Sequence, residues 1–303
     1  MARLRRNQTQ LEVLHMKRLF TILSLPLVLL ACGGGEGRLI IQNTGSDTLL
    51  SVAQAWAEAY AEVDPTIAIA VSGGGSGTGI SSMINGTVDI ANASRSMRDS
   101  EFVQAREQGY DPVEFIVGYD ALAVFLHPEN PLSEISMDQL LGIYGENGDI
   151  ETWSQLGISV PGCGSDEIVR VSRQNNSGTY AYFRDAVLEE SEFKLGSRDM
   201  HGSKDVVDLV ENTPCAIGYS GLAYATEHVA MPCVSRGEGT PCVAPSVDTA
   251  IDGSYSIARP LFMYTAEQPS GGVGAYMDWI LSDVGQCIIL EKGYAPVSTV
   301  TCT

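Results

Sequence analysis

Residues 38–71, RLIIQNTGSDTLLSVAQAWAEAYAEVDPTIAIAV, decide the fold. The first eight of these residues predict a strand that ends in a glycine turn, and residues 66–74 predict a second strand. Between the strands, apolar residues recur at the i, i+3, i+4, i+7 spacing of one helix face: Leu49, Val52, Ala53, Trp56, Ala57 and Tyr60. Ser46 and Asp47 are candidate caps at the start of this helix, and Pro65 ends it.

The same alternation continues along the chain. Residues 76–87 predict a loop that enters a short helix, and residues 88–94 predict another strand. Alternation of strand, loop and helix is typical of parallel α/β sheets, in which ligands bind at the carboxyl ends of strands and against helix N-termini. The sequence therefore predicts an α/β fold with a ligand site at its strand-to-helix junctions.

The middle of the chain predicts a crossing between two lobes. Residues 113–132 hold two apolar runs separated by Gly118, and we expect the crossing near Gly118 to Leu122. Residues 255–265 predict a strand that returns to the first lobe, and residues 271–290 predict one closing helix. The expected boundaries are 38–118 plus 255–303 for lobe 1 and 119–254 for lobe 2.

The N-terminus has the pattern of a secretory signal peptide. Lys17 and Arg18 precede an apolar run that is too short to span a membrane. Leu29-Leu30-Ala31-Cys32 resembles a bacterial lipobox, in which the cysteine is acylated and becomes the first mature residue. An ordinary cleavable signal with a stray cysteine is the alternative. We expect a signal peptide over 1–31, a Gly-rich linker over 32–37, and a periplasmic or cell-surface protein anchored by lipid at Cys32.

The chain is strongly acidic. It has 18 Lys and Arg against 37 Asp and Glu, for a net charge of −19, and removal of residues 1–31 takes away five basic residues and one acidic residue, which leaves −23. Such a field repels nucleic acid and anionic lipid headgroups, so we expect neither as a partner. Local donors must hold any anion that this protein binds.

Six cysteines remain after Cys32 in an exported chain, and an even number suggests three disulfides. Six cysteines allow 15 pairings. Short loops favour Cys163–Cys215, Cys233–Cys242 and Cys287–Cys302. A zinc site is the alternative, but the chain has no CxxC pair and its four histidines are scattered, so we expect no metal.

Three predicted strand-to-helix junctions are rich in hydroxyls and glycine: Ser46-Asp47-Thr48, Ser76-Gly77-Thr78-Gly79 and Ser177-Gly178-Thr179. Hydroxyls and backbone amides at helix starts hold tetrahedral oxyanions without a metal. Each junction alone has the alternative of an ordinary N-cap. Three of them together, with Arg173 beside the third, favour an anion site in which Arg173 binds in bidentate fashion rather than pairing on the surface.

Two further features bear on this predicted site. Ser94-Arg95 follows the strand over residues 88–94 and offers a hydroxyl and a second guanidinium, unless Arg95 pairs with Asp99. Asp47 would repel an anion that carries no proton. It would favour hydrogen phosphate, whose relevant pKa is roughly 6, over sulfate. The alternative is that Asp47 only caps its helix.

Motifs of catalysis are not visible. GGGSGTG (73–79) lacks both the Gly-Lys-Ser/Thr of a phosphate loop and the GxGxxG spacing of a dinucleotide site. Neither Ser76 nor Ser220 lies in GxSxG. We therefore expect a protein without catalysis and without a cofactor.

Several of these stretches, in this order, resemble the PstS-like phosphate-binding proteins of ABC transporters. They are TGSDTLLSVAQAWAEAY (44–60), SGGGSGTGISSMINGTVDIANASR (72–95), ALAVFLHPENPL (121–132), LLGIYGENGDIETWSQLG (140–157), the most specific motif Arg-x-x-x-Ser-Gly-Thr (173–179), and CAIGYSGLAYA (215–225). The resemblance implies a two-lobed type II periplasmic binding protein fold, in which each lobe is a mixed sheet flanked by helices and a hinge joins the lobes.

The resemblance also implies a ligand and its contacts. The implied contacts are Thr48, the amide of Leu49, Ser76, Arg173, Ser177, Gly178 and Thr179, and the phosphate-binding set that we expect adds Ser46, Asp47, Gly77, Ser94 and Arg95. Two positions depart from the family. Ser94 stands where its best-known members have an aspartate that accepts the phosphate proton, and Asn175 stands where they have an acidic partner for the arginine.

These observations predict a monomeric extracytoplasmic lipoprotein that binds inorganic phosphate between its lobes and delivers it to the transmembrane subunits of an ABC importer. The nearest alternative keeps the fold and binds sulfate, molybdate or an organic phosphate. An exported phosphatase with Ser76 or Thr179 as nucleophile and a phosphate sensor are further alternatives.

Overall fold

The computed structural model describes residues 38–237 and 239–302. The predicted signal peptide, Cys32 and the linker lie outside these residues. None of the described helices is both long enough and apolar enough to cross a membrane.

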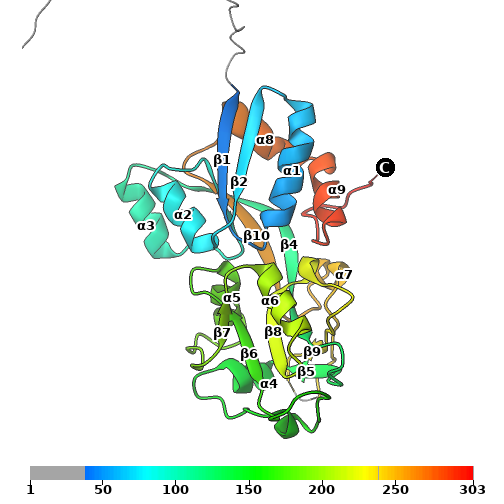
Figure 1. Ribbon diagram of the computed structural model, residues 1–303. Helices are drawn as coiled ribbons and strands as arrows, with labels where there is room; N and C mark the ends of the chain where they lie inside the picture. Colours follow the sequence, from blue (N-terminus) through cyan, green and yellow to red (C-terminus); the bar gives the residue numbers. More distant parts are fainter. Residues whose placement is uncertain (1–37, 238, 303) are drawn as a thin grey trace, which may run out of the picture. The chain divides into compact units, whose positions relative to one another are not determined.

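The elements fall into two groups that share one long strand, β4 (Val113–Leu126) (Figure 1). The first group, which we call lobe 1, contains β1 (Leu39–Gly45), α1 (Leu50–Val63), β2 (Ile67–Ser72), α2 (Ser76–Ile84), β3 (Ile90–Ala93), α3 (Asp99–Glu107), β10 (Ala258–Thr265), α8 (Gly271–Ile280) and α9 (Asp283–Glu291). The second group, lobe 2, contains β5 (Glu134–Ser136), α4 (Met137–Tyr144), η1 (Trp153–Leu156), β6 (Val169–Arg173), α5 (Gly178–Ala186), β7 (Arg198–Met200), α6 (Ser203–Glu211), β8 (Ala216–Gly221), η2 (Leu222–Tyr224), β9 (Cys233–Ser235) and α7 (Val247–Ile251).

One sheet runs through both lobes in the order β2-β1-β3-β10-β4-β8-β6-β7. In lobe 1, β1 is parallel to β2 and β3, and β10 is antiparallel to β3 and β4. In lobe 2, β8 is antiparallel to β4 and parallel to β6, which is parallel to β7. The predicted mixed sheets with flanking helices are therefore confirmed.

Strand β4 connects the lobes by changing its partner. Its residues 113–121 pair with β10, and residues 122–126 pair with β8. Strand β4 continues through Gly118. The β4–β10 ladder shifts its register at this glycine. A Cβ atom at Gly118 would lie 2.3 Å from Cδ1 of Ile289, so only glycine lets α9 pack this closely on the strand.

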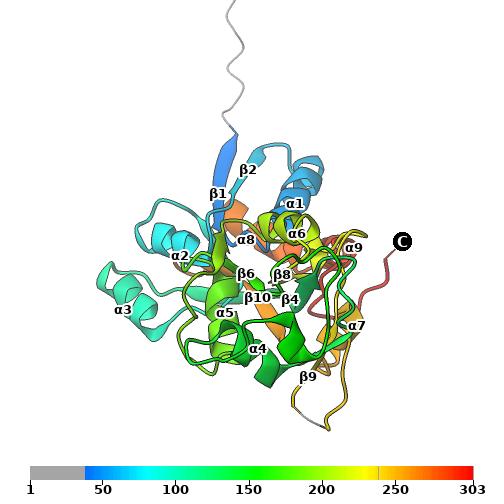
Figure 2. The ribbon, with the colours of Figure 1, turned by 60° about the horizontal axis from the view of Figure 1, so that its bottom comes forward.

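Each lobe has its own hydrophobic core. In lobe 1, α1, α8 and α9 lie together on one side and α2 and α3 on another, as Figure 1 and Figure 2 both show. The rings of Tyr60 and Tyr276 meet edge to face in the first of these cores, with centroids 4.9 Å apart. In lobe 2, the rings of Phe183 and Tyr219 stack at 3.8 Å.

The prediction of one closing helix over residues 271–290 is wrong. The structure has two helices, α8 and α9, separated at Leu281 and Ser282. Ser282 is extended at the N-cap of α9, its hydroxyl donates to the Trp279 carbonyl at 2.6 Å, and Asp283 supplies an acidic first residue. Ser282 makes no side-chain cap hydrogen bond, so the break in the apolar periodicity goes with its extended backbone and with the acidic first residue of α9, which suits a helix N-terminus.

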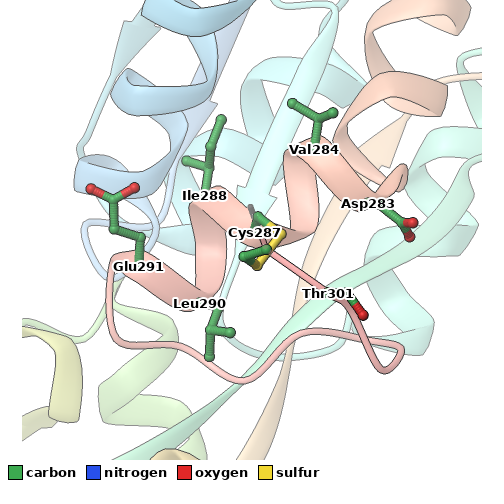
Figure 3. Close-up of a pocket in the computed structure, with 8 residues that line it drawn as sticks. Asp283, Val284, Cys287, Ile288, Leu290, Glu291 and Thr301 are labelled. Carbon is green, nitrogen blue, oxygen red and sulfur yellow. A yellow bond between two sulfur atoms is a disulfide. The ribbon is translucent and has the colours of Figure 1, made fainter.

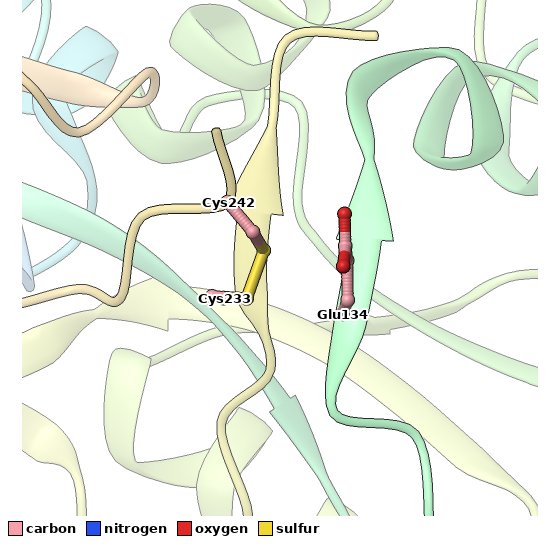
Figure 4. Close-up of side chains that lie close together, drawn as sticks. All are labelled: Glu134, Cys233 and Cys242. Carbon is pink, nitrogen blue, oxygen red and sulfur yellow. A yellow bond between two sulfur atoms is a disulfide. The ribbon is translucent and has the colours of Figure 1, made fainter. Parts of the chain in front are cut away.

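The six cysteines form the three disulfides that short loops favour: Cys163–Cys215, Cys233–Cys242 and Cys287–Cys302. Glu134 lies beside the second of these (Figure 4). Because its two sulfurs are bonded to one another, this cluster offers a metal one carboxylate and no thiolate.

Helix α2 lies against the end of β1 through Gly79. A Cβ atom there would stand 2.5 Å from the Thr44 carbonyl oxygen and 2.7 Å from Cα of Gly45. We expect Gly79→Ala to lower the free energy of unfolding by about 2 kcal/mol, because backbone must move to make room. Gly164→Ala is the control, since Gly164 has open space around its Cα, and urea unfolding measures both. Equal stability of the two variants would contradict this packing.

Candidate anion-binding site

The parallel strands of lobe 1 bring three serines together. Ser46 follows β1, Ser76 begins α2 after β2, and Ser94 follows β3. The Ser46 hydroxyl donates to Oγ of Ser94 at 2.9 Å, and the Ser94 amide donates to Oγ of Ser76 at 3.0 Å. All three side chains are buried. The predicted junctions therefore meet at one edge of the sheet, as parallel strands require.

Lobe 2 supplies the start of α5. Ser177 is its N-cap, and the Ser177 hydroxyl accepts a hydrogen bond from the Thr179 amide at 3.1 Å. Gly178 lies directly against lobe 1, because a Cβ atom there would stand 2.3 Å from Oγ of Ser76 and 2.6 Å from Oγ of Ser94. Only glycine allows the backbone of α5 to approach these hydroxyls.

Contacts between the lobes join the predicted residues. The Oγ1 atoms of Thr48 and Thr179 lie 3.1 Å apart. The Gly77 amide donates to the Asn176 carbonyl at 2.9 Å, and Nδ2 of Asn176 donates to the Gly74 carbonyl at the same distance. Asn176 was not among the predicted residues, because an asparagine before an N-cap has no pattern that distinguishes it from a loop residue.

Arg173 is buried, with 1% of its surface exposed. Its guanidinium donates to Oγ of Ser203 at 2.9 Å and to the His201 carbonyl at 2.8 Å. Its Nε–H has no hydrogen-bond partner among the described residues. Burial lowers the pKa of Arg173 and Asp47 raises it, but an arginine keeps its charge in proteins. The predicted cluster thus contains a buried cation with a free donor.

Asp47 pairs with that cation. Its Oδ2 lies 3.5 Å from Nη2 of Arg173, and its Oδ1 accepts from the Gly74 amide at 3.2 Å. Its side chain does not cap α1, whose N-cap is Leu49 without a side-chain hydrogen bond, so the capping interpretation is wrong. Asn175 is exposed, and Asp47 supplies the acidic partner for Arg173 that the chain lacks at residue 175.

Arg95 is held by a different carboxylate. Its two Nη atoms donate to Glu101 at 2.8 and 2.7 Å, rather than to Asp99, and Nη1 also donates to the Ser96 carbonyl. Burial raises the pKa of Glu101, but the hydrogen bonds from Arg95 and the Arg98 amide hold that pKa below its usual value. Arg95 therefore forms its ion pair within lobe 1.

A second buried ion pair, which the sequence patterns did not indicate, lies at the site. Asp120 of β4 and Arg259 of β10 are cross-strand neighbours. Oδ2 of Asp120 lies 2.8 Å from Nη2 of Arg259, and both side chains are fully buried. Nη2 of Arg259 also lies within hydrogen-bond distance of Thr48 and Thr179. The overlooked pattern is one charge inside each of two apolar strands, since a charge buried in a core has to be paired.

Of two hollows in the protein, one borders the cluster of buried hydroxyls and arginines and the other lies away from it. A cavity of about 280 Å³ borders it and is lined by Ser94, Arg95, Ser96, Met97, Arg98, Tyr182, Asp185, Arg259, Pro260 and Phe262. A larger groove of about 590 Å³ runs along α9 beside the Cys287–Cys302 disulfide (Figure 3). None of the predicted site residues lines that groove. The buried donors, rather than the larger hollow, define the candidate site.

Comparison with known proteins assigns the family. A model of the PBP superfamily domain matches residues 32–284. The phosphate-binding protein PstS of Pseudomonas aeruginosa is 32% identical over 270 residues, which cover 85% of this chain and 83% of that protein. This chain belongs to the PstS-like phosphate-binding protein family. Its members are substrate-binding proteins of transporters and not enzymes.

Solved structures agree with this family. A phosphate ABC transporter substrate-binding protein from Clostridium perfringens, determined with bound phosphate, is 28% identical to the chain, with a TM-score of 0.74. The match covers 86% of this chain and all of that one. A phosphate transport receptor from Vibrio cholerae, 24% identical with a TM-score of 0.66, shares the fold. The fold is therefore that of a type II periplasmic binding protein.

Proposed function

We propose that this protein binds inorganic phosphate between its lobes and delivers it to the transmembrane subunits of an ABC importer. Membership in the PstS-like family supports the ligand and the partner. One observation carries the proposal: buried hydroxyls of both lobes meet at the starts of α1, α2 and α5, and Asp47, the neighbour of Thr48, pairs with the buried guanidinium of Arg173. Such a site binds without catalysing a reaction.

The proposed contacts use the starts of three helices. The N-termini of α1, α2 and α5 carry Thr48 and the Leu49 amide, Ser76 and Gly77, and Ser177 to Thr179. The helix dipoles at these ends favour an anion. The amides of Leu49, Gly77 and Thr179 donate to protein oxygens in this structure, so an anion that they bind replaces those hydrogen bonds. Ser46 and Ser94 add hydroxyls and Arg173 adds a full positive charge. We do not assign Arg95 a contact with the anion, because Glu101 occupies both of its Nη atoms.

Asp47 gives the proposed site a way to distinguish oxyanions. Its carboxylate lies beside Arg173 and is 7% exposed, so an anion that contacts Arg173 also meets a negative charge. A phosphate that carries a proton can donate it to this carboxylate, whereas sulfate has no proton at neutral pH and is repelled. We infer that Asp47, and not the residue after β3, supplies the acceptor in this chain.

Isothermal titration of the mature protein tests the ligand. We expect phosphate to bind and sulfate and molybdate to bind far more weakly, and we expect Arg173→Gln to weaken phosphate binding about 100-fold through the loss of charged hydrogen bonds. Arg184→Gln is the control, because Arg184 pairs with Asp185 and Glu192 near the surface. Tight sulfate binding without phosphate binding would overturn the proposed ligand.

The role of Asp47 is tested by selectivity. We expect Asp47→Asn to weaken phosphate binding about tenfold and to narrow the gap between phosphate and sulfate, since the neutral amide no longer repels sulfate. Asp111→Asn, at an exposed ion pair with Arg106, should leave both affinities unchanged. A phosphate-to-sulfate ratio that stays the same in Asp47→Asn would exclude Asp47 as the acceptor.

We also propose that the mature chain is a monomer anchored outside the cytoplasm by lipid at Cys32. The lipobox pattern at residues 29–32 supports the anchor, and three disulfides fit an oxidising compartment. We expect Cys32→Ser to move the protein from the membrane fraction to the soluble fraction, with unchanged phosphate binding. A Cys32→Ser protein that stays in the membrane fraction would contradict the anchor.

A further inference from the structure

Strand β10 places a second guanidinium at the site. Nη2 of Arg259 lies 3.3 Å from Oγ1 of Thr48 in lobe 1 and 3.0 Å from Oγ1 of Thr179 in lobe 2. We propose that Arg259 is a positioning residue of the anion site, which aims the hydroxyl hydrogens of Thr48 and Thr179 at the bound anion. This inference rests on the proposed phosphate function.

The chemistry of arginine fixes the direction of these hydrogen bonds. A guanidinium has donors and no acceptor, so each threonine oxygen accepts from Nη2, which shares its two hydrogens among Asp120, Thr48 and Thr179. The hydroxyl hydrogens then have to point elsewhere. The contact between Thr48 and Thr179 uses at most one of the two hydrogens. At least one of the two threonine hydroxyls therefore keeps a hydrogen that it can donate. An anion that inserts between Thr48 and Thr179 can accept a hydrogen bond from each of them.

Asp120 holds the guanidinium in this orientation. Its Oδ2 accepts from Nε of Arg259 at 3.2 Å and from Nη2 at 2.8 Å. Nη1 donates to the Ser94 carbonyl at 3.1 Å, and Cζ lies 5.5 Å from the ring centre of Tyr182. Burial raises the pKa of Asp120 and Arg259 opposes that rise. A rigid, fully buried fork of this kind orients its partners more precisely than a flexible lysine.

The position of this pair also links the site to the hinge. Asp120 lies on β4, which pairs with strands of both lobes, and Arg259 lies on β10, the neighbour of β4 in lobe 1. Nη2 of Arg259 contacts one residue from each lobe, so the full set of contacts exists only while the lobes are together. Arg259 is also one of the residues that line the 280 Å³ cavity beside Ser94.

The main test replaces the pair without leaving a charge unpaired. The double variant Asp120→Asn/Arg259→Gln keeps two side chains of similar size that can hydrogen bond to each other, and titration with inorganic phosphate measures its affinity. We expect binding about 100-fold weaker than in the wild type. Arg170→Gln is the control, because Arg170 forms a 2.6 Å pair with Glu151 in lobe 2, away from the threonines. Binding within threefold of the wild type would overturn the inference.

A double-mutant cycle separates positioning from a structural role. Thr48→Val removes the hydroxyl and keeps the shape, and we expect it to weaken phosphate binding about tenfold in the wild type but less than threefold beside Arg259→Gln. If Arg259 only supports the fold, Thr48→Val will cost the same in both backgrounds, and the inference fails.

One measurement needs no variant that has to fold. In the ¹⁵N-labelled wild type, phosphate should shift the guanidinium NMR signals of Arg173 and Arg259 and leave that of Arg170 in place. A shifted Arg173 signal with an unshifted Arg259 signal would overturn the inference about Arg259 and leave the proposed phosphate binding in place. Absence of any phosphate binding by the wild type would overturn the proposed function and this inference with it.

Discussion

Four charged side chains are buried where the lobes meet, and each of them has to be paired. Asp47, Asp120, Arg173 and Arg259 are all at most 7% exposed. An isolated charge in such a place costs several kcal/mol, so the fold is stable only where the two ion pairs form. One pair joins lobe 1 to lobe 2, and the other joins the neighbouring strands β4 and β10. This requirement sets the relative positions of the helix starts that carry the hydroxyls.

The same arrangement explains how a strongly acidic chain can hold an anion. The whole chain carries a net charge of −19, which opposes the approach of phosphate. Binding must therefore come from short-range donors with little water around them. Helix N-termini provide such donors without a counter-charge of their own, and each arginine has a carboxylate neighbour. Neutral hydroxyls and amides can then distinguish ligands by the number and direction of their hydrogen bonds.

Sequence predicted the part of this site that depends on local order along the chain. The three junctions, the N-cap at Ser177 and Arg173 follow from periodicity and capping patterns, which involve neighbours within one turn. The partners of the charges did not follow. Asp47 is 126 residues from Arg173 and Asp120 is 139 residues from Arg259, so each pairing depends on how strands and lobes are arranged. Asp47 is a plausible helix cap until that arrangement is known.

A crystal structure of the mature protein grown with phosphate would show directly where the anion binds. We expect one phosphate between the lobes, with its oxygens within about 3.2 Å of the Thr48 and Thr179 hydroxyls and of the Arg173 guanidinium. Phosphate bound elsewhere, with these three groups still bonded only to protein atoms, would contradict the assignment of the site.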